Sequence, residues 1–330
     1  MEWGPLTLDD APALARFWAD VEAADRADER YSVDDVREQL AHHLIDLPEG
    51  TLAARDGDRI AAFGYLPVRQ SAEGGVHVLR LWGGVHPAYR RRGLGRRIVA
   101  WAAGAAGALS ERAFPGVPAE IHLGAYDGDP GANALAGQAG FTAVRRFATM
   151  RRDLADGLPA PRTPAGVSIA TWTPELDDGA RHVRNESFRD HWGSVPHTRE
   201  SWAGHIVGTH NFLPRASFLA LAEGRAVGTL ITHAAPHAPN HEGHARIQII
   251  GTLKEWRGRG VAGALIAHAL ASFVRQGYSS TSLGVDLDNP TGAVGVYERA
   301  GFTVTRSSTN YALPVTQRET RDEPAVAVHE

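Results

Sequence analysis

Apolar residues recur along the chain with the two periods expected of amphipathic helices and of buried strands. Residues 245–252 and 279–287 predict strands, and residues 217–232 predict a hairpin that turns at Glu223 and Gly224. A helix with one buried face is predicted where apolar residues recur at every fourth position, at Val261, Leu265, Ala269 and Phe273. The second half of the chain is therefore expected to form a layered α+β domain.

The first half repeats this order of elements. It predicts a hairpin at Asp56 and Gly57, a strand over 76–85, a helix from Arg92, a strand over 120–126 and a closing strand over 141–150. The stretch YRRRGLGRRIVAWAAGA, from Tyr89, also resembles WRGRGVAGALIAHALAS, from Trp256. We therefore expect a duplicated domain rather than a solenoid of short repeats.

The length of 330 residues fits two domains of roughly 150 residues each. Proline, alanine and glycine dominate residues 154–166, which show no apolar period, so we place an interdomain linker there. The expected division is a first domain over 1–153, a second over 167–316, and a flexible tail over 317–330.

Composition narrows the class of function. The chain has no cysteine, which excludes disulfides, thiolate metal sites and cysteine nucleophiles, and its net charge of -4 gives no reason to expect nucleic acid. No apolar run approaches the roughly 18 residues that span a bilayer, and the N-terminus shows neither a secretory nor a transit pattern. We expect a cytoplasmic protein with no membrane partner, either a monomer or a homodimer.

The stretch WRGRGVAGAL, residues 256–265, carries two overlapping motifs. Gly258, Gly260 and Gly263 spell the dinucleotide fingerprint G-x-G-x-x-G, and Asp286 follows at about the spacing of its ribose-binding carboxylate, about 20 residues on. Arg257, Gly260 and Ala262 also spell R-x-x-G-x-A, which indicates a different phosphate ligand.

The distance of the loop from the preceding strand shows which of the two motifs applies. In a dinucleotide unit the first glycine follows directly on the strand, whereas residues 253–257 intervene here. The first copy of the loop has Ile98 where the third glycine would stand, so the repeated motif is R-x-x-G-x-G/A. The arginine-first motif is therefore favoured.

Such a loop turns backbone N–H groups toward one point at the positive end of a helix, where a pyrophosphate can bind. Arg257 and Arg259, like Arg90–Arg92 in the first copy, can add charge-assisted hydrogen bonds. The alternative is an ordinary glycine-rich helix start with solvated arginines. Two copies in matched contexts favour the ligand site.

Both halves resemble the GNAT superfamily of acetyl-CoA-dependent N-acetyltransferases, whose pyrophosphate loop is Q/R-x-x-G-x-G/A between the fourth strand and the third helix. The segment DNPTGAVGVYERAGF, residues 288–302, resembles the closing segment of that family. The resemblance, closest to actinobacterial tandem members, implies an α+β fold of two domains, each a mixed, mostly antiparallel sheet flanked by helices. It also implies acetyl-CoA as the cofactor, with Asn289 contacting it and Tyr297 near the thioester sulfur.

The resemblance extends the cofactor site to the end of the fourth strand and to the glycine loop. In the second half the expected binding residues are Ile250, Gly251, Thr252, Leu253, Arg257, Gly258, Arg259, Gly260, Val261, Ala262 and Asn289. In the first half they are Val85, Arg90, Arg91, Arg92, Gly93, Leu94 and Gly95.

Acetyl transfer to an amine passes through an oxyanion and expels a thiolate, so the site needs donors at the carbonyl and a proton for sulfur. Tyr297 is the predicted general acid; the alternative is an aromatic that packs one helix onto the sheet. Many relatives place a glutamate on the fourth strand as the base, but residues 245–252 contain no carboxylate. Flanking segments offer Asp190, His191, His233, Glu242 and His244, of which His191 and Glu242 are the preferred base candidates.

Closely spaced histidines can also bind a metal, and the segment 233–244 contains four, His233, His237, His241 and His244. Two prolines and the lack of periodicity favour an ordinary connection between strands, so no metal is expected.

The two halves differ at the predicted acid. Counting back from the glycine of each Gly-Phe pair places Ala136 opposite Tyr297, and Gly128 opposite Asn289. We therefore expect the second half to catalyse acetyl transfer to a primary amine of a small molecule or peptide, and the first to bind CoA or serve a structural role. The alternative is a non-catalytic acyl-CoA-binding sensor or scaffold.

Overall fold

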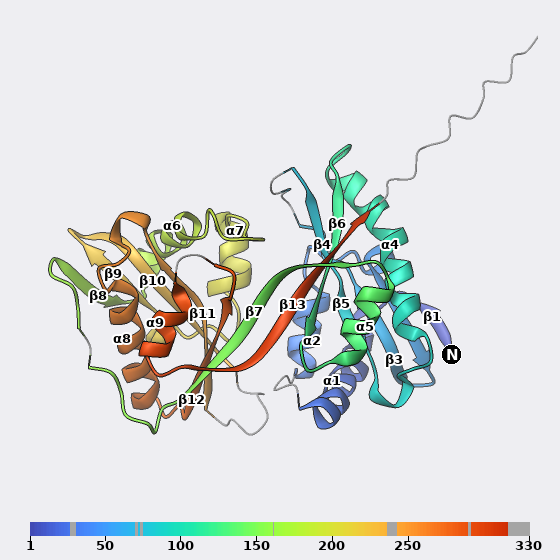
Figure 1. Cartoon of the computed structure of the whole chain (residues 1–330), viewed down its shortest axis with the longest axis horizontal. Coiled ribbons are helices and arrows are strands. Elements are labelled where there is room, and N and C mark those ends of the chain that lie inside the picture. The colour runs from blue at the N-terminus through green and yellow to red at the C-terminus, as the bar shows by residue number, and fades with distance from the viewer. Residues whose placement is uncertain are drawn as a thin grey trace, which may run out of the picture.

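The computed structural model describes residues 1–26, 31–69, 72, 75–160, 162–235, 243–289 and 292–315. Two sheets carry the fold: a four-stranded sheet in the order β1-β2-β3-β5 and a nine-stranded sheet in the order β4-β6-β13-β7-β12-β11-β10-β9-β8. Helices pack on the sheets in both halves (Figure 1). The predicted α+β architecture is confirmed.

The first half contributes strands β1 (Glu2–Gly4), β2 (Thr51–Asp56), β3 (Arg59–Tyr65), β4 (His77–Arg80), β5 (Trp82–Val85), β6 (Ala119–Tyr126) and β7 (Thr142–Asp153). Its helices are α1 (Ala11–Asp25), α2 (Val33–Leu40), α3 (Leu47–Gly50), α4 (Leu94–Ala113) and α5 (Pro130–Gln138).

The second half contributes strands β8 (Val167–Thr171), β9 (Phe218–Ala222), β10 (Arg225–Ala234), β11 (His244–Thr252), β12 (Ser280–Asp286) and β13 (Thr303–Val315). Its helices are α6 (Asp177–Ser187), α7 (Arg199–Trp202), the π-helical turn η4 (Ala203–Val207), α8 (Val261–Arg275) and α9 (Ala293–Arg299). The periodic residues Val261, Leu265, Ala269 and Phe273 are all buried in the core of this half, as their spacing predicts.

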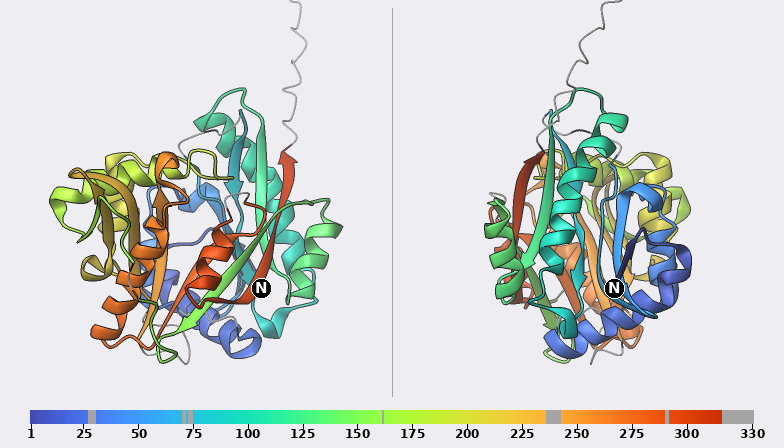
Figure 2. Two further views of the ribbon diagram at one scale, coloured as in Figure 1. Left: turned by 60° about the vertical axis from the view of Figure 1, so that its left-hand side comes forward. Right: turned by 90° about the vertical axis from the view of Figure 1, so that its right-hand side faces the viewer.

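The closing strands of the two halves are exchanged. β7 of the first half pairs with β12 of the second, from Phe147↔Asp286 to Asp153↔Ser280, and β13 of the second half pairs with β6 of the first, from Ser308↔Tyr126 to Val315↔Ala119. β7 and β13 also pair with each other, and Figure 1 and the left view of Figure 2 show them side by side at the centre of the molecule. Each half therefore completes its sheet with a strand from the other.

Each exchanged strand also contributes side chains to the hydrophobic core of the other half. Ala148 and Met150 of β7 are buried in the core of the second half. Tyr311, Leu313 and Val315 of β13 pack against the core of the first half. Because buried apolar area is the main source of folding stability, neither half has a complete core without the other.

Each long helix lies close to its sheet at a glycine. A Cβ at Gly64 in β3 would stand 2.6 Å from Ile98 of α4, and one at Gly228 in β10 would stand 2.7 Å from Val261 of α8. Only a residue without a side chain lets the helix approach this far. The two contacts involve different turns of the two helices, but both hold the N-terminal half of a helix close to its sheet.

The region predicted to be a linker contains no helix or strand in its described residues, 154–160 and 162–166. The tail at 317–330 lies outside the described residues. The division of the chain into two domains at residues 154–166 stays a prediction. Strand β7 before this region and strand β13 after it each join the sheet of the other half. None of the helices that are described is both long and apolar enough to cross a membrane.

Candidate active site

An opening between two parallel strands marks the site in the second half. β11 and β12 pair from His244↔Ser280 to Ile247↔Leu283, and the pairing then stops although β11 continues to Thr252 and β12 to Asp286. β10 pairs with β11 along the same stretch, with a register shift at Ile231/Thr232. The facing edges of β11 and β12 therefore diverge beyond this point. Their backbone N–H and C=O groups there can pair with an extended ligand.

The first half has the same opening. β4 pairs with β6 only as far as Arg80↔His122, and the chain then turns into β5, which pairs with β3 instead. Gly83 lies at this switch with φ of 149°, and a Cβ there would stand 2.1 Å from the carbonyl oxygen of Phe63. The sequence predicts one strand over 76–85, and this change of sheet breaks it in two.

The two glycine loops have matched backbones. Gly258 and Gly260 have φ of 73° and 87°, and Arg91 and Gly93 have φ of 62° and 80° at the equivalent positions. Gly260 is the N-cap of α8 and Gly93 the N-cap of α4, and neither helix has a side-chain cap. The first-turn N–H groups of both helices therefore point out of the helix without a capping acceptor, as an anion site requires.

The first arginine of each loop braces the strand end. Arg257 donates from Nε to the carbonyl oxygen of Thr252 at 3.3 Å and from Nη2 to that of Ser187 at 3.0 Å. In the first half Arg90 donates from Nε to the carbonyl oxygen of Val85 at 3.3 Å and pairs with Asp25 at the end of α1. Each arginine thus joins the loop, the strand end and a helix end. This geometry gives both side chains a positioning role, and their predicted contact with pyrophosphate stays a prediction.

An arginine at the third position of each loop, Arg259 or Arg92, lies over the aromatic ring that precedes the loop. Arg259 lies 5.0 Å from the ring centroid of Trp256, and Arg92 lies 5.2 Å from that of Tyr89. Such cation–π contacts hold a guanidinium in place without consuming its charge. Phosphate contacts through these side chains remain a prediction.

The remaining predicted residues of the strand end lie against α6. A Cβ at Gly251 would stand 3.0 Å from Oγ of Ser187, so the helix end covers one face of the strand. Ile250 and Leu253 pack against the core, and the side chain of Val261 is buried in it. The hydroxyls of Ser187 and Thr252 are buried and have no hydrogen-bond partner in the described part of the chain. Two orphan donors at this point are what a bound polar ligand would satisfy.

Tyr297 lies in α9 and packs against the core of the second half, at the edge of the Phe302 ring. Burial raises the pKa of Tyr297 to about 12. The phenol is therefore protonated at physiological pH, and it is a weaker acid than an ordinary tyrosine, whose pKa is about 10. Asn289 lies in the turn after β12, which ends at Asp286, and its N–H donates to the carbonyl oxygen of Asp286 at 3.3 Å.

His191 is the base candidate that the fold brings to the opening. Its Nε2 lies 3.9 Å from the carboxylate of Asp286, at the end of β12. Asp286 is 1% exposed and is held by Arg145 through hydrogen bonds of 2.9 and 3.0 Å. Arg145 comes from the exchanged strand β7, so the first half contributes a residue to this site.

A cavity of about 500 Å³ lies beside His191, which is within the usual size of small-molecule sites. It is lined by residues between 184 and 196, including Phe188, His191 and Trp192. The Trp192 ring stacks on His122 of β6 at a centroid distance of 5.3 Å. The cavity loop is thus held against the first half.

The other base candidates are placed differently. Asp190 lines the cavity but is exposed, and Glu242 lies outside the described residues, as do His237 and His241. His233 contacts the carbonyl oxygen of Ile206 at 2.9 Å, and buried His244 is held between Ser280 and Ser282 at 2.8 Å each. Both histidines therefore serve the fold rather than the opening.

Comparison with known families decides among the alternatives. The Acetyltransferase (GNAT) family matches residues 15–141 and 178–302, one region in each half and together more than half of the chain. The chain belongs to this family. The predicted N-acetyltransferase is confirmed, the dinucleotide hypothesis is wrong, and the enzyme is favoured over the non-catalytic alternative.

Several relatives of known name are similar over nearly the whole chain. The mycothiol acetyltransferase of Mycobacteroides abscessus is 32% identical over 94% of this chain and 98% of that protein. The mycothiol acetyltransferase of Salinispora arenicola is 29% identical over 93% of each chain.

Solved structures agree with the tandem fold. A GCN5-related N-acetyltransferase from Sphaerobacter thermophilus has a TM-score of 0.75 at 26% identity, covering 95% of both chains. A tandem GNAT protein from the clavulanic acid biosynthesis pathway has a TM-score of 0.69 at 21% identity, covering 96% of this chain and 98% of that one, and shows the fold alone.

Sequence reasoning missed Arg145, and it considered Asp286 only as a ribose ligand. Nothing in the local pattern of β7 indicates that it joins the other half. The one available signal was Asp286 itself, which ends an apolar strand and has no basic residue beside it in sequence. A buried carboxylate of this kind needs a charged partner from elsewhere in the fold.

Proposed function

We propose that the protein transfers the acetyl group of acetyl-CoA to a primary amine of a small molecule, with the chemistry in the second half. One observation carries the proposal: the opening between β11 and β12 lies next to the glycine-capped start of α8, in the half that contains Tyr297. The first half repeats the opening and the loop but has buried Ala136 where Tyr297 stands.

The cofactor would bind in two parts. The uncapped N–H groups at the start of α8 take the pyrophosphate, where the helix dipole favours negative charge. The extended pantetheine arm carries amide groups, which can pair with the free edge of β11 beyond Ile247. The thioester then lies toward Thr252 and Ser187, whose hydroxyls need a partner.

The reaction forms a bond between the amine nitrogen and the thioester carbonyl carbon and breaks the bond between that carbon and sulfur. The nitrogen gives a proton to the base, and CoA leaves as a thiolate that then takes up a proton from solvent. The pKa of Tyr297 is about 12 and that of a thiol is about 8.5, so full proton transfer from the phenol to the thiolate is unfavourable. Tyr297 instead donates a hydrogen bond to the departing sulfur. Tyr297 thus stabilises the developing thiolate.

The acceptor amine must be neutral to attack. An amine of pKa near 10.4 is neutral in about one molecule in 2,500 at pH 7, which adds roughly 4.6 kcal/mol to the barrier. His191 faces the cavity and lies against the Asp286 carboxylate, which can stabilise an imidazolium after proton transfer. We assign His191 as the base.

The cavity favours a polar acceptor, because arginine, glutamate and aspartate side chains line it together with two aromatic rings. Relatives at 29% and 32% identity are named mycothiol acetyltransferases, so acceptors of the mycothiol type are the first to test. The first half either binds a second CoA or supports the second half through β7.

Release of free CoA thiol tests the proposal directly, since the protein has no cysteine to add background. Acetyl-CoA is mixed with each of a panel of amines, including mycothiol-type amines, aminoglycosides and lysine peptides, and for an acceptor with a thiol of its own the CoA is separated by chromatography before it is measured. The proposal predicts release that depends on one small-molecule class. Tight acetyl-CoA binding without release for any amine would contradict it.

A further inference from the structure

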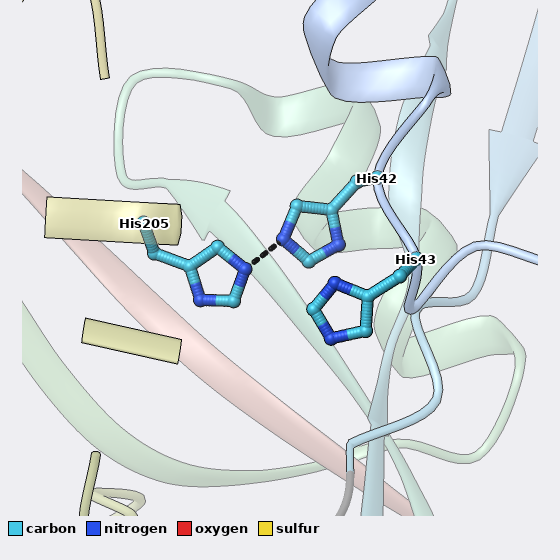
Figure 3. A group of neighbouring side chains, drawn as sticks. All are labelled: His42, His43 and His205. Atoms are coloured by element: carbon cyan, nitrogen blue, oxygen red, sulfur yellow. Dashed lines mark hydrogen bonds between the residues drawn. The ribbon is translucent and has the colours of Figure 1, made fainter. Parts of the chain in front are cut away.

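Three histidines from the two halves meet at one point. His42 and His43 lie just after α2, and His205 lies in the π-helical turn η4 after α7. Each offers a ring nitrogen, and these three nitrogens all lie within 4.8 Å of one another. Figure 3 shows the rings gathered between the two segments, with His42 and His205 in direct contact through their Nε2 atoms.

The rings are stacked as well as clustered. The centroid distances are 4.2 Å for His42 and His205, 4.7 Å for His42 and His43, and 5.5 Å for His43 and His205. A hydrogen bond joins the His42 and His205 rings, and stacking places His43 beside them, so that a third imidazole nitrogen lies within 4.8 Å of the other two.

The same two segments are already held together beside the cluster. His210 of the second half lies 3.1 Å from Asp35 and 2.8 Å from Glu38, both in α2. A metal at the histidines would therefore join parts whose relative position is largely set, which reduces the entropy lost on binding.

We propose that His42, His43 and His205 bind one divalent ion of the zinc type and that this ion links the two halves. Three imidazole nitrogens suit Zn²⁺, Co²⁺, Ni²⁺ or Cu²⁺ rather than Mg²⁺ or Ca²⁺, which prefer oxygen. His43 is exposed, so the ion can enter from solvent, and the fourth ligand position stays open to water.

One contact must change on binding. The N–H of Leu44 donates to Nδ1 of His42 at 3.1 Å, which places the proton of the neutral ring on Nε2. Coordination through Nε2 moves that proton to Nδ1, so His42 must turn away from Leu44. The three histidines are not among those of segment 233–244, for which the sequence pattern predicts no metal.

Zinc binding to the full-length, tag-free, chelator-treated protein tests the site by calorimetry, and Co²⁺ absorption reports the ligand geometry. We expect one Zn²⁺ per chain and visible Co²⁺ bands of tetrahedral intensity. His205→Ala should weaken Zn²⁺ at least about a hundredfold, since even supporting partners are worth about 10–100-fold.

Two further variants make the outcome decisive. His43→Ala changes an exposed side chain, so it should preserve the fold, as far-ultraviolet circular dichroism would verify, and still weaken Zn²⁺. The double variant His237→Ala, His241→Ala removes the competing histidines and should leave zinc affinity within about threefold. Equal affinity in wild type, His205→Ala and His43→Ala, or loss of binding in the double variant, would overturn the proposal.

Discussion

At the scale of single residues, the loop glycines have the backbone conformation of an anion-binding turn, and the first arginine of each loop has protein partners that the motif does not show. Gly258 and Gly260 have the positive φ that brings N–H groups to one point. Arg257 is turned back to Thr252 and Ser187, which the motif alone could not show, because those partners lie on other elements. The backbone part of the site was thus predictable, and the side-chain part depended on the fold.

Tyr297→Phe should lower kcat by about 100-fold, at the low end of general acid–base effects, because the phenol loses only a hydrogen bond to sulfur. Affinity for acetyl-CoA should change less than about threefold. Since the pKa of Tyr297 is about 12, kcat should show no loss from its ionisation up to pH 10. Steady-state thiol release and calorimetry measure both quantities. A kcat equal to that of wild type would assign Tyr297 to packing alone.

At the scale of elements, the sequence predicted which segments are strands better than which strands are partners. Apolar runs identify β7 and β13, but the same run can pair with either half. The predicted strand at 76–85 breaks at Leu81 because its two parts join different sheets, whereas β11 stays continuous at the matching point. Pairing is decided by long-range contacts that a local pattern does not contain.

Gly228→Ala should destabilise the protein by about 1–3 kcal/mol, because its Cβ would overlap Val261 and press the start of α8 away from the sheet. Gly104→Ala is the matched control. Gly104 lies in α4 with open space around it, so alanine there should stabilise by roughly 0.5–1 kcal/mol. Urea unfolding measures both. The same sign for both variants would refute the packing argument.

At the scale of the whole molecule, the strand exchange makes the two halves depend on each other. Arg145 and Asp286 extend this dependence from the fold into the site, since the second half takes a charged partner from the first. Duplication was visible in the sequence as repeated motifs. The exchange was not, because each copy carries a complete set of strand signals.

A fragment over 142–315 keeps β7 and its buried Ala148 and Met150, and it should fold with a cooperative thermal transition. A fragment over 154–315 exposes the edge of β12 and loses both residues from its core, so it should be unfolded or aggregate. Circular dichroism melting compares the two. Equal melting temperatures would show that β7 is dispensable.

The central claim is that acetyl transfer occurs in the second half, and a matched pair of variants tests it most directly. Gly260 and Gly93 are both N-caps with positive φ, so valine at either position carries a similar backbone cost of about 1–2 kcal/mol. Neither added Cβ would meet protein atoms closer than 3.9 Å, so the main new contact is with a bound phosphate. We expect amine-dependent thiol release to fall at least tenfold in Gly260→Val and to stay within about threefold of wild type in Gly93→Val. The reverse pattern would place the chemistry in the first half and contradict the account.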